Sequence, residues 1–195
     1  MTKILFFDLE TTGLDHKIHG IHQLGGMLEI DGQVMEQFNF HIRPDGQLKI
    51  DDAALKVSGI TRDDLLSYPT EVEVYQKLIS ILARHIDKFD KLDKAFLGGY
   101  NNASFDNHFL RELFIRNNDK YFGSWFWSNP LDVMILATAF TLEYRYQMPN
   151  FKLMTVASEL LGDIDESKLH DANYDNELTR NIYQIVKHTK QWKMQ

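Results

Sequence analysis

The chain has no cysteine among its 195 residues. Disulfide scaffolds, thiolate zinc sites and cysteine nucleophiles are therefore excluded together. Long apolar runs are missing as well: four apolar residues, 4–7, separate Met1-Thr2-Lys3 from Asp8, too few for a signal-peptide core. No later run approaches the roughly 18 apolar residues of a membrane span. We expect a soluble, cytoplasmic protein with no membrane segment.

Positive charge is also in short supply. Lys and Arg number 21 against 28 Asp and Glu, which gives a formal net charge of -7. This balance argues against a protein that coats nucleic acid through a broad basic surface. It does not exclude an enzyme that acts on nucleic acid, because a site that gathers carboxylates around divalent cations is negative until the metal binds.

Repeats, low-complexity tracts and interdomain linkers are absent from the sequence, and its 4 prolines all fall at plausible element boundaries. A chain of 195 residues has the length of one domain, and 44% hydrophobic residues with 12% aromatics can supply one core. We therefore expect a single domain over residues 1–195.

The apolar pattern predicts a mixed α/β fold. Residues 4–7 are typical of a central strand buried on both faces, and Asp31-Gly32 between two apolar runs is a strong hairpin signal. Strands are expected at 4–7, 27–30, 34–42, 95–100 and 125–127, and helices at 69–86, 105–114, 131–142, 151–161 and 173–190. The prediction is a mixed five-stranded sheet with helices on both faces.

Two acidic residues follow the first strand. Asp8 and Glu10 are two residues apart, so the strand period places both carboxylates on one face. Taken alone, the pair also fits a solvated strand end. The turn that follows, residues 11–14 (Thr-Thr-Gly-Leu), offers backbone N–H groups and hydroxyls that could hold a phosphate or a terminal ribose hydroxyl.

Two further acidic positions lie at helix starts. Asp106 falls in the first turn of the helix after the fourth strand, where compensation of the helix dipole is the simpler explanation. If the fourth strand adjoins the first, however, Asp106 reaches the same end of the sheet as Asp8. His170 is expected in the turn before the last helix, and Asp175 in that helix's first turns. A helix-start histidine and an exposed aspartate are the alternatives.

These residues carry a resemblance to a known family. Residues 7–14 (FDLETTGL), residues 102–106 (NASFD) and His170-x4-Asp175, in this order, resemble the three exonuclease motifs of the DEDD family, histidine subfamily. Residues 57–61 (VSGIT), followed by Pro69-Thr70 and an amphipathic helix, resemble the segment between motifs in the proofreading subunits of bacterial DNA polymerase III. The resemblance covers nearly the whole chain.

The resemblance implies an RNase H-like fold, two divalent metal ions (Mg²⁺ or Mn²⁺) and removal of 5′-mononucleotides from the 3′ end of single-stranded nucleic acid. By the matching motif positions, it also implies that Asp8, Glu10, Asp106 and Asp175 are metal ligands. His170 is the implied general base. The implied substrate-binding residues are Thr11, Thr12, Leu14, Asn102 and Phe105. In this chain Asn101 stands where many relatives have histidine. A polymerase or replication protein is an implied partner, although no tethering tail follows the last helix.

Several functions remain open at this stage. We expect an exonuclease, with DNA favoured over RNA as substrate; an RNA-trimming exoribonuclease of the same family is the alternative. An endonuclease or other phosphoesterase on the same fold is a second alternative. A non-catalytic module that binds nucleic acid or a polymerase is a third, but such a module is expected to have lost a ligand, and every ligand position is acidic. The histidines other than His170, including His16, His19 and His22, are assigned structural or surface roles.

Overall fold

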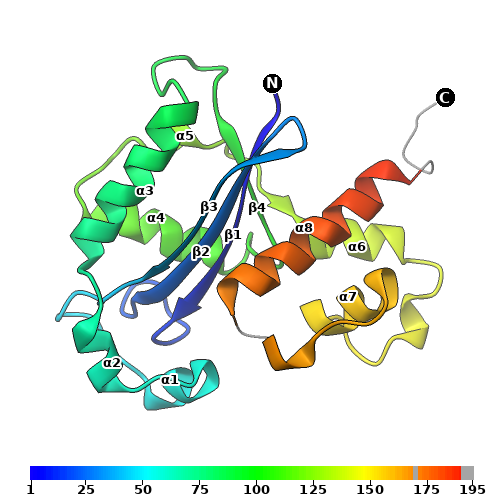
Figure 1. Cartoon of the computed structure of the whole chain (residues 1–195), viewed down its shortest axis with the longest axis horizontal. Helices are drawn as coiled ribbons and strands as arrows, with labels where there is room; N and C mark the ends of the chain where they lie inside the picture. Colours follow the sequence, from blue (N-terminus) through cyan, green and yellow to red (C-terminus); the bar gives the residue numbers. More distant parts are fainter. Residues whose placement is uncertain (169–170, 190–195) are drawn as a thin grey trace.

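A computed structural model describes residues 1–168 and 171–189, and its centre is a mixed sheet with strand order β3-β2-β1-β4-β5 (Figure 1). The strands are β1 (Lys3–Thr11), β2 (Ile21–Ile30), β3 (Gln33–His41), β4 (Ala95–Gly99) and β5 (Leu131–Asp132). β2 runs antiparallel to β1 and β3, whereas β4 runs parallel to β1 and β5. The predicted mixed five-stranded sheet is confirmed.

Helices cover both faces of the sheet. The α-helices are α1 (Asp52–Ser58), α2 (Arg62–Ser67), α3 (Glu71–His85), α4 (Asp106–Arg116), α5 (Phe122–Trp125), α6 (Val133–Phe140), α7 (Leu153–Leu161) and α8 (Ala172–His188). Short 3₁₀ turns occupy Arg145–Gln147 and Glu166–Lys168. α3, α4 and α5 lie on one side, α6, α7 and α8 on the other, and α1 and α2 lie near the end of β1 (Figure 1). Within the described ranges no helix is long and apolar enough to cross a membrane.

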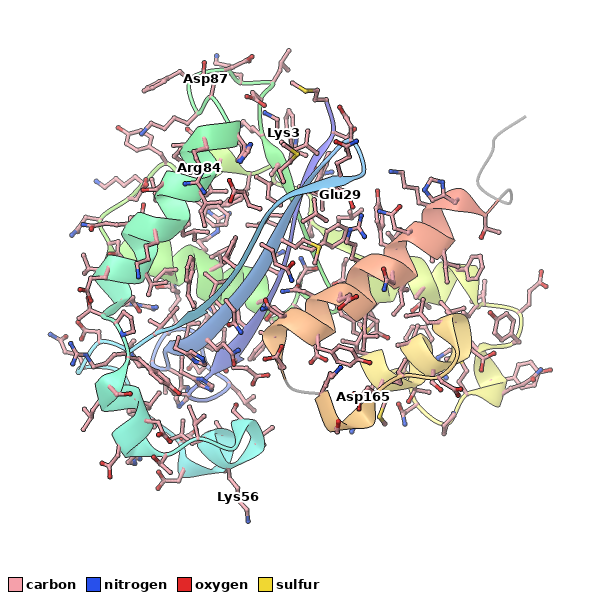
Figure 2. The ribbon with its side chains drawn as sticks, viewed as in Figure 1. Lys3, Glu29, Lys56, Arg84, Asp87 and Asp165 are labelled. Carbon is pink, nitrogen blue, oxygen red and sulfur yellow. The ribbon has the colours of Figure 1, made fainter. Side chains whose placement is uncertain are left out.

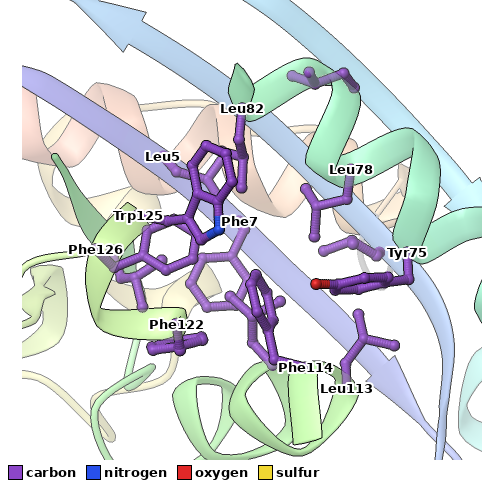
Figure 3. Close-up of a cluster of buried hydrophobic side chains, with 14 of the residues drawn as sticks. Leu5, Phe7, Tyr75, Leu78, Leu82, Leu113, Phe114, Phe122, Trp125 and Phe126 are labelled. Atoms are coloured by element: carbon purple, nitrogen blue, oxygen red, sulfur yellow. The ribbon is translucent and has the colours of Figure 1, made fainter. Parts of the chain in front are cut away.

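The two sides of β1 build two cores. Leu5 and Phe7 join the buried cluster on the side of α3 and α4, which Figure 3 shows, whereas Ile4 and Phe6 join the cluster on the side of α6, α7 and α8. This division follows from the strand period of two. Full burial of such side chains contributes about 1.5–3 kcal/mol each, so β1 is fixed from both faces.

The predicted hairpin between β2 and β3 is confirmed. Asp31 has φ 49° and Gly32 has φ 88°, and two positive φ values in succession are those of a type I′ turn. The turn forms because Asp tolerates and Gly readily adopts this conformation.

The expected strand at 125–127 is wrong. Trp125 ends the one-turn helix α5, and Phe126 makes only an isolated bridge to Ala95. The fifth strand is instead Leu131–Asp132, which pairs with Gly98–Gly99. Aromatic residues favour strands in general, but here Trp125 and Phe126 are both buried in the same cluster, which an alternating strand does not permit.

A buried ion pair ties α8 to the sheet. Arg180 Nε donates to Glu29 Oε2 at 2.7 Å, and Gln184 Nε2 donates to the same oxygen at 3.0 Å. Glu29 lies on β2 beside α8 (Figure 2), and its side chain is only 2% exposed. This contact fixes the helix that carries Asp175.

Candidate active site

The acidic pair on β1 faces α8. Asp8 and Glu10 have the same parity as Phe6, whose side chain packs in the cluster on the α8 side. Asp8 is paired in register with Gly25 of β2. A Cβ atom at Gly25 would lie 2.8 Å from the carbonyl carbon of Ala172, the first residue of α8. Glycine therefore lets α8 begin directly against the sheet, which brings its first turns beside Asp8.

Asp106 reaches the same end of the sheet from another element. It is the first residue of α4, follows β4 and is 6% exposed. Because β4 is parallel to β1, the carboxyl ends of both strands meet at one edge, as the sequence predicts. The pKa of Asp106 is raised to about 7, chiefly by burial and also by the charges of Glu10 and Asp132, whereas hydrogen bonds from backbone N–H groups act to lower it.

The charges of several other acidic residues act on Asp8. Burial raises its pKa well above the ordinary value, and the negative charges that raise it further are, in order of size, those of Asp106, Asp175, Glu10 and Asp171. Three acidic residues distant in the sequence thus act on one carboxylate together with its neighbour Glu10. The structure thus places Glu10, Asp106 and Asp175 near enough to Asp8 for their charges to act on its carboxylate.

The arrangement suits divalent cations by its chemistry. Within residues 1–168 and 171–189, no three His, Asp or Glu side chains are placed closely enough in this conformation to hold a metal ion. The donors are nonetheless all carboxylates, the hard oxygen ligands preferred by Mg²⁺ and Mn²⁺. The pKa of Asp8 is raised first by burial and then by repulsion from the neighbouring carboxylates, and a bound cation would oppose both effects. His170, the predicted general base, lies outside the described residues.

The turn after β1 presents one apolar side chain to solvent. Leu14 is 84% exposed, whereas Thr12 is fully buried. The Thr12 hydroxyl donates to the carbonyl of Lys49 at 2.7 Å and accepts from the N–H of Gly20 at 2.9 Å. The Thr11 hydroxyl donates to the carbonyl of Gly13 at 2.8 Å. In this conformation the two threonines hold the turn, and Leu14 is the residue that the turn displays.

The segment before α4 also divides into supporting and accessible residues. Asn102 is fully buried, and its amide nitrogen donates to the carbonyl of Leu97 at 3.1 Å. Phe105 is half-buried and stacks at 5.0 Å on Phe109 in a tilted arrangement. Asn102 therefore supports the segment, whereas Phe105, which precedes Asp106 in the chain, is only partly covered.

Asp132 is a supporting residue that sequence reasoning missed. Its carboxylate accepts from the backbone N–H groups of Asn101 at 3.1 Å and Ala103 at 3.2 Å, and it also caps α6 through Met134 N–H. It thereby ties β5 to the segment that leads to Asp106. The pattern of an aspartate before an apolar helix predicts the cap alone; the two contacts across the sheet have no local signal.

Ser58 and His22 were missed as well. Ser58 Oγ donates to Glu10 Oε2 at 3.0 Å, and His22 Nε2 lies 3.1 Å from Ser58 Oγ. Burial, together with the nearby His41, lowers the pKa of His22 to about 4. The assignment of His22 to a structural or surface role thus omitted its indirect connection to the acidic site.

Comparison with curated proteins relates the chain to bacterial replicative polymerases. The DNA polymerase III PolC-type of Mycoplasmopsis pulmonis is 30% identical over 177 residues, which are 91% of this chain and 11% of the relative. That of Mycoplasma pneumoniae is 25% identical over 183 residues, 94% of this chain and 11% of the relative. This chain therefore spans only a small part of these curated relatives.

Comparison with solved structures and with family models completes the assignment. Escherichia coli exonuclease I in complex with a dT13 oligonucleotide superposes with a TM-score of 0.76 at 21% identity, over 96% of this chain and 41% of that one. Its zinc-bound complex with single-stranded DNA gives 0.75 at 21% identity, over 96% and 40%. The fold is thus RNase H-like. A family model of the RNase T type, described as exonuclease, matches residues 5–183, a span that contains every acidic residue gathered at the end of β1. Because this match covers most of the chain, the chain belongs to the exonuclease family, as a DEDD-type member.

Proposed function

We propose that this chain is a 3′–5′ exonuclease that depends on two divalent cations, Mg²⁺ or Mn²⁺, and degrades single-stranded DNA to 5′-mononucleotides. The observation that carries the proposal is the convergence of acidic groups on Asp8, whose pKa is raised by burial and by Asp106, Asp175, Glu10 and Asp171. The likeness to PolC-type polymerases and to exonuclease I bound to DNA oligonucleotides supports DNA over RNA.

In the proposed reaction, a water oxygen forms a bond to the phosphorus of the terminal phosphodiester. The bond between phosphorus and the 3′ oxygen of the preceding nucleotide breaks, and that oxygen takes up a proton. His170 is proposed to accept the proton of the attacking water, as a base with an ordinary pKa near 6.5 can at neutral pH. Asp8, Glu10, Asp106 and Asp175 would hold the two cations, which supply the positive charge that activates the water and stabilises the leaving oxygen.

The same geometry supports a small site for an unpaired terminal nucleotide. Leu14 is exposed on a turn fixed by internal hydrogen bonds, and we propose that it wedges against the terminal base. The half-buried ring of Phe105 would pack beneath the terminal sugar or base. Base stacking is worth about 1–3 kcal/mol and tolerates any sequence, which fits an enzyme that removes successive nucleotides.

One assay tests activity, polarity and sugar preference together. Single strands of DNA and of RNA, each labelled at the 5′ or the 3′ end, are incubated with the protein and Mg²⁺ or Mn²⁺. We expect 5′-labelled DNA to shorten as a ladder and 3′-labelled DNA to release a labelled mononucleotide at once, with EDTA stopping both. Faster digestion of RNA would assign the alternative, an RNA-trimming enzyme.

The Asp8→Asn variant is the control for contaminating nucleases, because it keeps the size of the side chain and removes one proposed ligand. Equal digestion by this variant, or cleavage of a circular single strand, would contradict the proposal. If no strand is cut but DNA is still bound, the non-catalytic module would replace it.

A further inference from the structure

Glu10 is reached by a chain of hydrogen bonds that comes from outside the carboxylate group. Ser58, the last residue of α1, is half-buried, and its Oγ lies 3.0 Å from Glu10 Oε2. On the other side, His22 Nε2 lies 3.1 Å from the same Oγ. Serine and histidine are 48 and 12 residues away from Glu10 in the sequence, so the contact exists only in the folded protein.

A register shift in the sheet places His22 within reach of Ser58, so that it joins this series of hydrogen bonds. The pairing of β1 with β2 shifts between Glu10, which faces Gln23, and Thr11, which faces Ile21. His22 falls in the shift and has no partner residue in β1. Irregularities of this kind re-aim side chains next to functional sites, and here the imidazole is directed at Ser58.

The direction of the hydrogen bonds follows from counting protons. A serine hydroxyl has one proton to donate and lone pairs that accept. The Glu10 carboxylate only accepts, so the Ser58 proton points to Glu10. Ser58 Oγ must then accept from His22, which requires the proton of the neutral imidazole to be on Nε2. The chain therefore runs from His22 N–H through Ser58 O–H to Glu10.

This series of hydrogen bonds restricts the orientation of the Glu10 carboxylate. The side chain of Glu10 is long, and a second acidic side chain, that of Asp8, lies two residues away on the same face of β1. A donor fixed on Oε2 restricts the carboxylate before a cation arrives, so less ordering remains for the binding step. Ser58 is well suited to this because α1 anchors it through the buried side chain of Leu55.

We propose that Ser58 and His22 are positioning residues that hold Glu10 in the orientation needed to bind a divalent cation. The inference rests on the proposed function, in which Glu10 is a cation ligand. Ser58 acts on Glu10 directly, and His22 acts through Ser58. Neither residue needs to touch the substrate or the cation.

The test compares Mn²⁺ affinity, measured by calorimetric titration, in wild type, Ser58→Ala and Ser58→Thr. Loss of groups that orient a metal ligand weakens binding by about 10-fold or more, so we expect this of Ser58→Ala. Ser58→Thr keeps the hydroxyl and should bind Mn²⁺ nearly as wild type does. In assays at saturating Mn²⁺, Ser58→Ala should lower kcat more than it raises KM. The matched control is Ser80→Ala, which removes a hydroxyl that donates to the carbonyl of Gln76 on the surface of α3.

The contribution of His22 is tested by a double-mutant cycle. Because His22 acts through Ser58, the loss in Mn²⁺ affinity caused by His22→Leu should largely disappear when Ser58 is already alanine. His22 is buried, and if His22→Leu does not fold, the Ser58 variants decide the matter alone. Unchanged affinity in Ser58→Ala, equal losses in the Ala and Thr variants, or fully additive effects of the two residues would overturn the inference. If wild type itself does not bind Mn²⁺, the proposed function fails instead.

Discussion

Asp106 shows at the residue scale how the acidic site is linked to stability. Burial raises its pKa from the ordinary value of 3.8 to about 7. A carboxyl whose pKa is higher in the folded than in the unfolded protein contributes stability that is fully present below the unfolded value and is lost as pH rises through the folded value. The relevant window is therefore from about pH 4 to about pH 7.

We predict that the metal-free protein loses of order a few kcal/mol of unfolding free energy across this window because of Asp106. Asp106→Asn should lose less, because only the contribution of Asp8 remains, and should be more stable than wild type near neutral pH, while losing activity. Urea denaturation in EDTA, at a series of pH values, measures both. Asp63→Asn, at an exposed position of α2, should follow wild type. Identical pH dependence of wild type and Asp106→Asn would count against the prediction.

Asn176 is a second residue whose environment is unfavourable. It is 1% exposed, and among the described residues neither its amide nitrogen nor its amide oxygen has a hydrogen-bond partner. A buried unpaired polar group costs about 1–3 kcal/mol, and alanine is also a better helix former than asparagine. Asn176→Ala should therefore raise the unfolding free energy by about 1 kcal/mol, net of the small cavity that it leaves.

Asn181→Ala on the same helix is the matched comparison, because Asn181 is half-exposed and offers only the gain in helix propensity. Chemical denaturation of both variants without metal separates the two contributions. A loss of stability confined to Asn176→Ala would mean that the buried amide is satisfied, for instance by an enclosed water.

At the scale of elements, the position of α8 matters most, because this helix brings Asp175 to β1. Arg180 and Gln184 hold it through Glu29 of β2. The side chain of Glu29 is 2% exposed and that of Arg180 22%. Removal of one partner leaves a buried carboxylate poorly compensated, which costs about 3–5 kcal/mol in comparable cases.

We predict that Arg180→Met destabilises the protein by about 3 kcal/mol and weakens Mn²⁺ binding, since α8 is no longer tied to β2. The double variant Glu29→Gln with Arg180→Met should recover most of the stability, because the buried charge is gone. Urea denaturation gives the free energies and calorimetry the affinities. A double variant as unstable as Arg180→Met would show that lost packing, rather than lost charge compensation, is the cause.

At the scale of the whole molecule, cations and folding should be coupled. The acidic residues come together only in the folded chain, so a cation that they bind stabilises this state alone. At a concentration of 100 times Kd the gain is about 2.7 kcal/mol, which corresponds to a rise in Tm of roughly 5–10 °C for a chain of this size.

Differential scanning fluorimetry in Mn²⁺ and in EDTA measures this shift. We expect it in wild type and expect it to be lost in Asp8→Asn. An equal shift in Asp8→Asn would place the bound cation elsewhere on the molecule.

Local patterns determined much of what the sequence predicted correctly. The apolar run at the start of β1, the Asp31-Gly32 turn and the periodic helices all depend on interactions between residues close together in the chain. The acidic positions could also be selected from the sequence, because the strand period places Asp8 and Glu10 on one face and because the motifs occur in a recognisable order. The histidine base is still a prediction, since His170 lies outside the described residues.

The tertiary structure alone decided the rest. Strand β5 has two residues, too short for any periodic signal, and α1 has one buried residue, so neither could be predicted from a pattern. The contacts of Asp132 with the 101–103 segment and of Ser58 with Glu10 join residues about 30 to 50 positions apart. The type of a side chain indicates what it is able to bind, whereas the packing of distant elements determines which partner it contacts. The motifs therefore predict the acidic residues of the site, but the residues that contact those acids can be identified only from the folded structure.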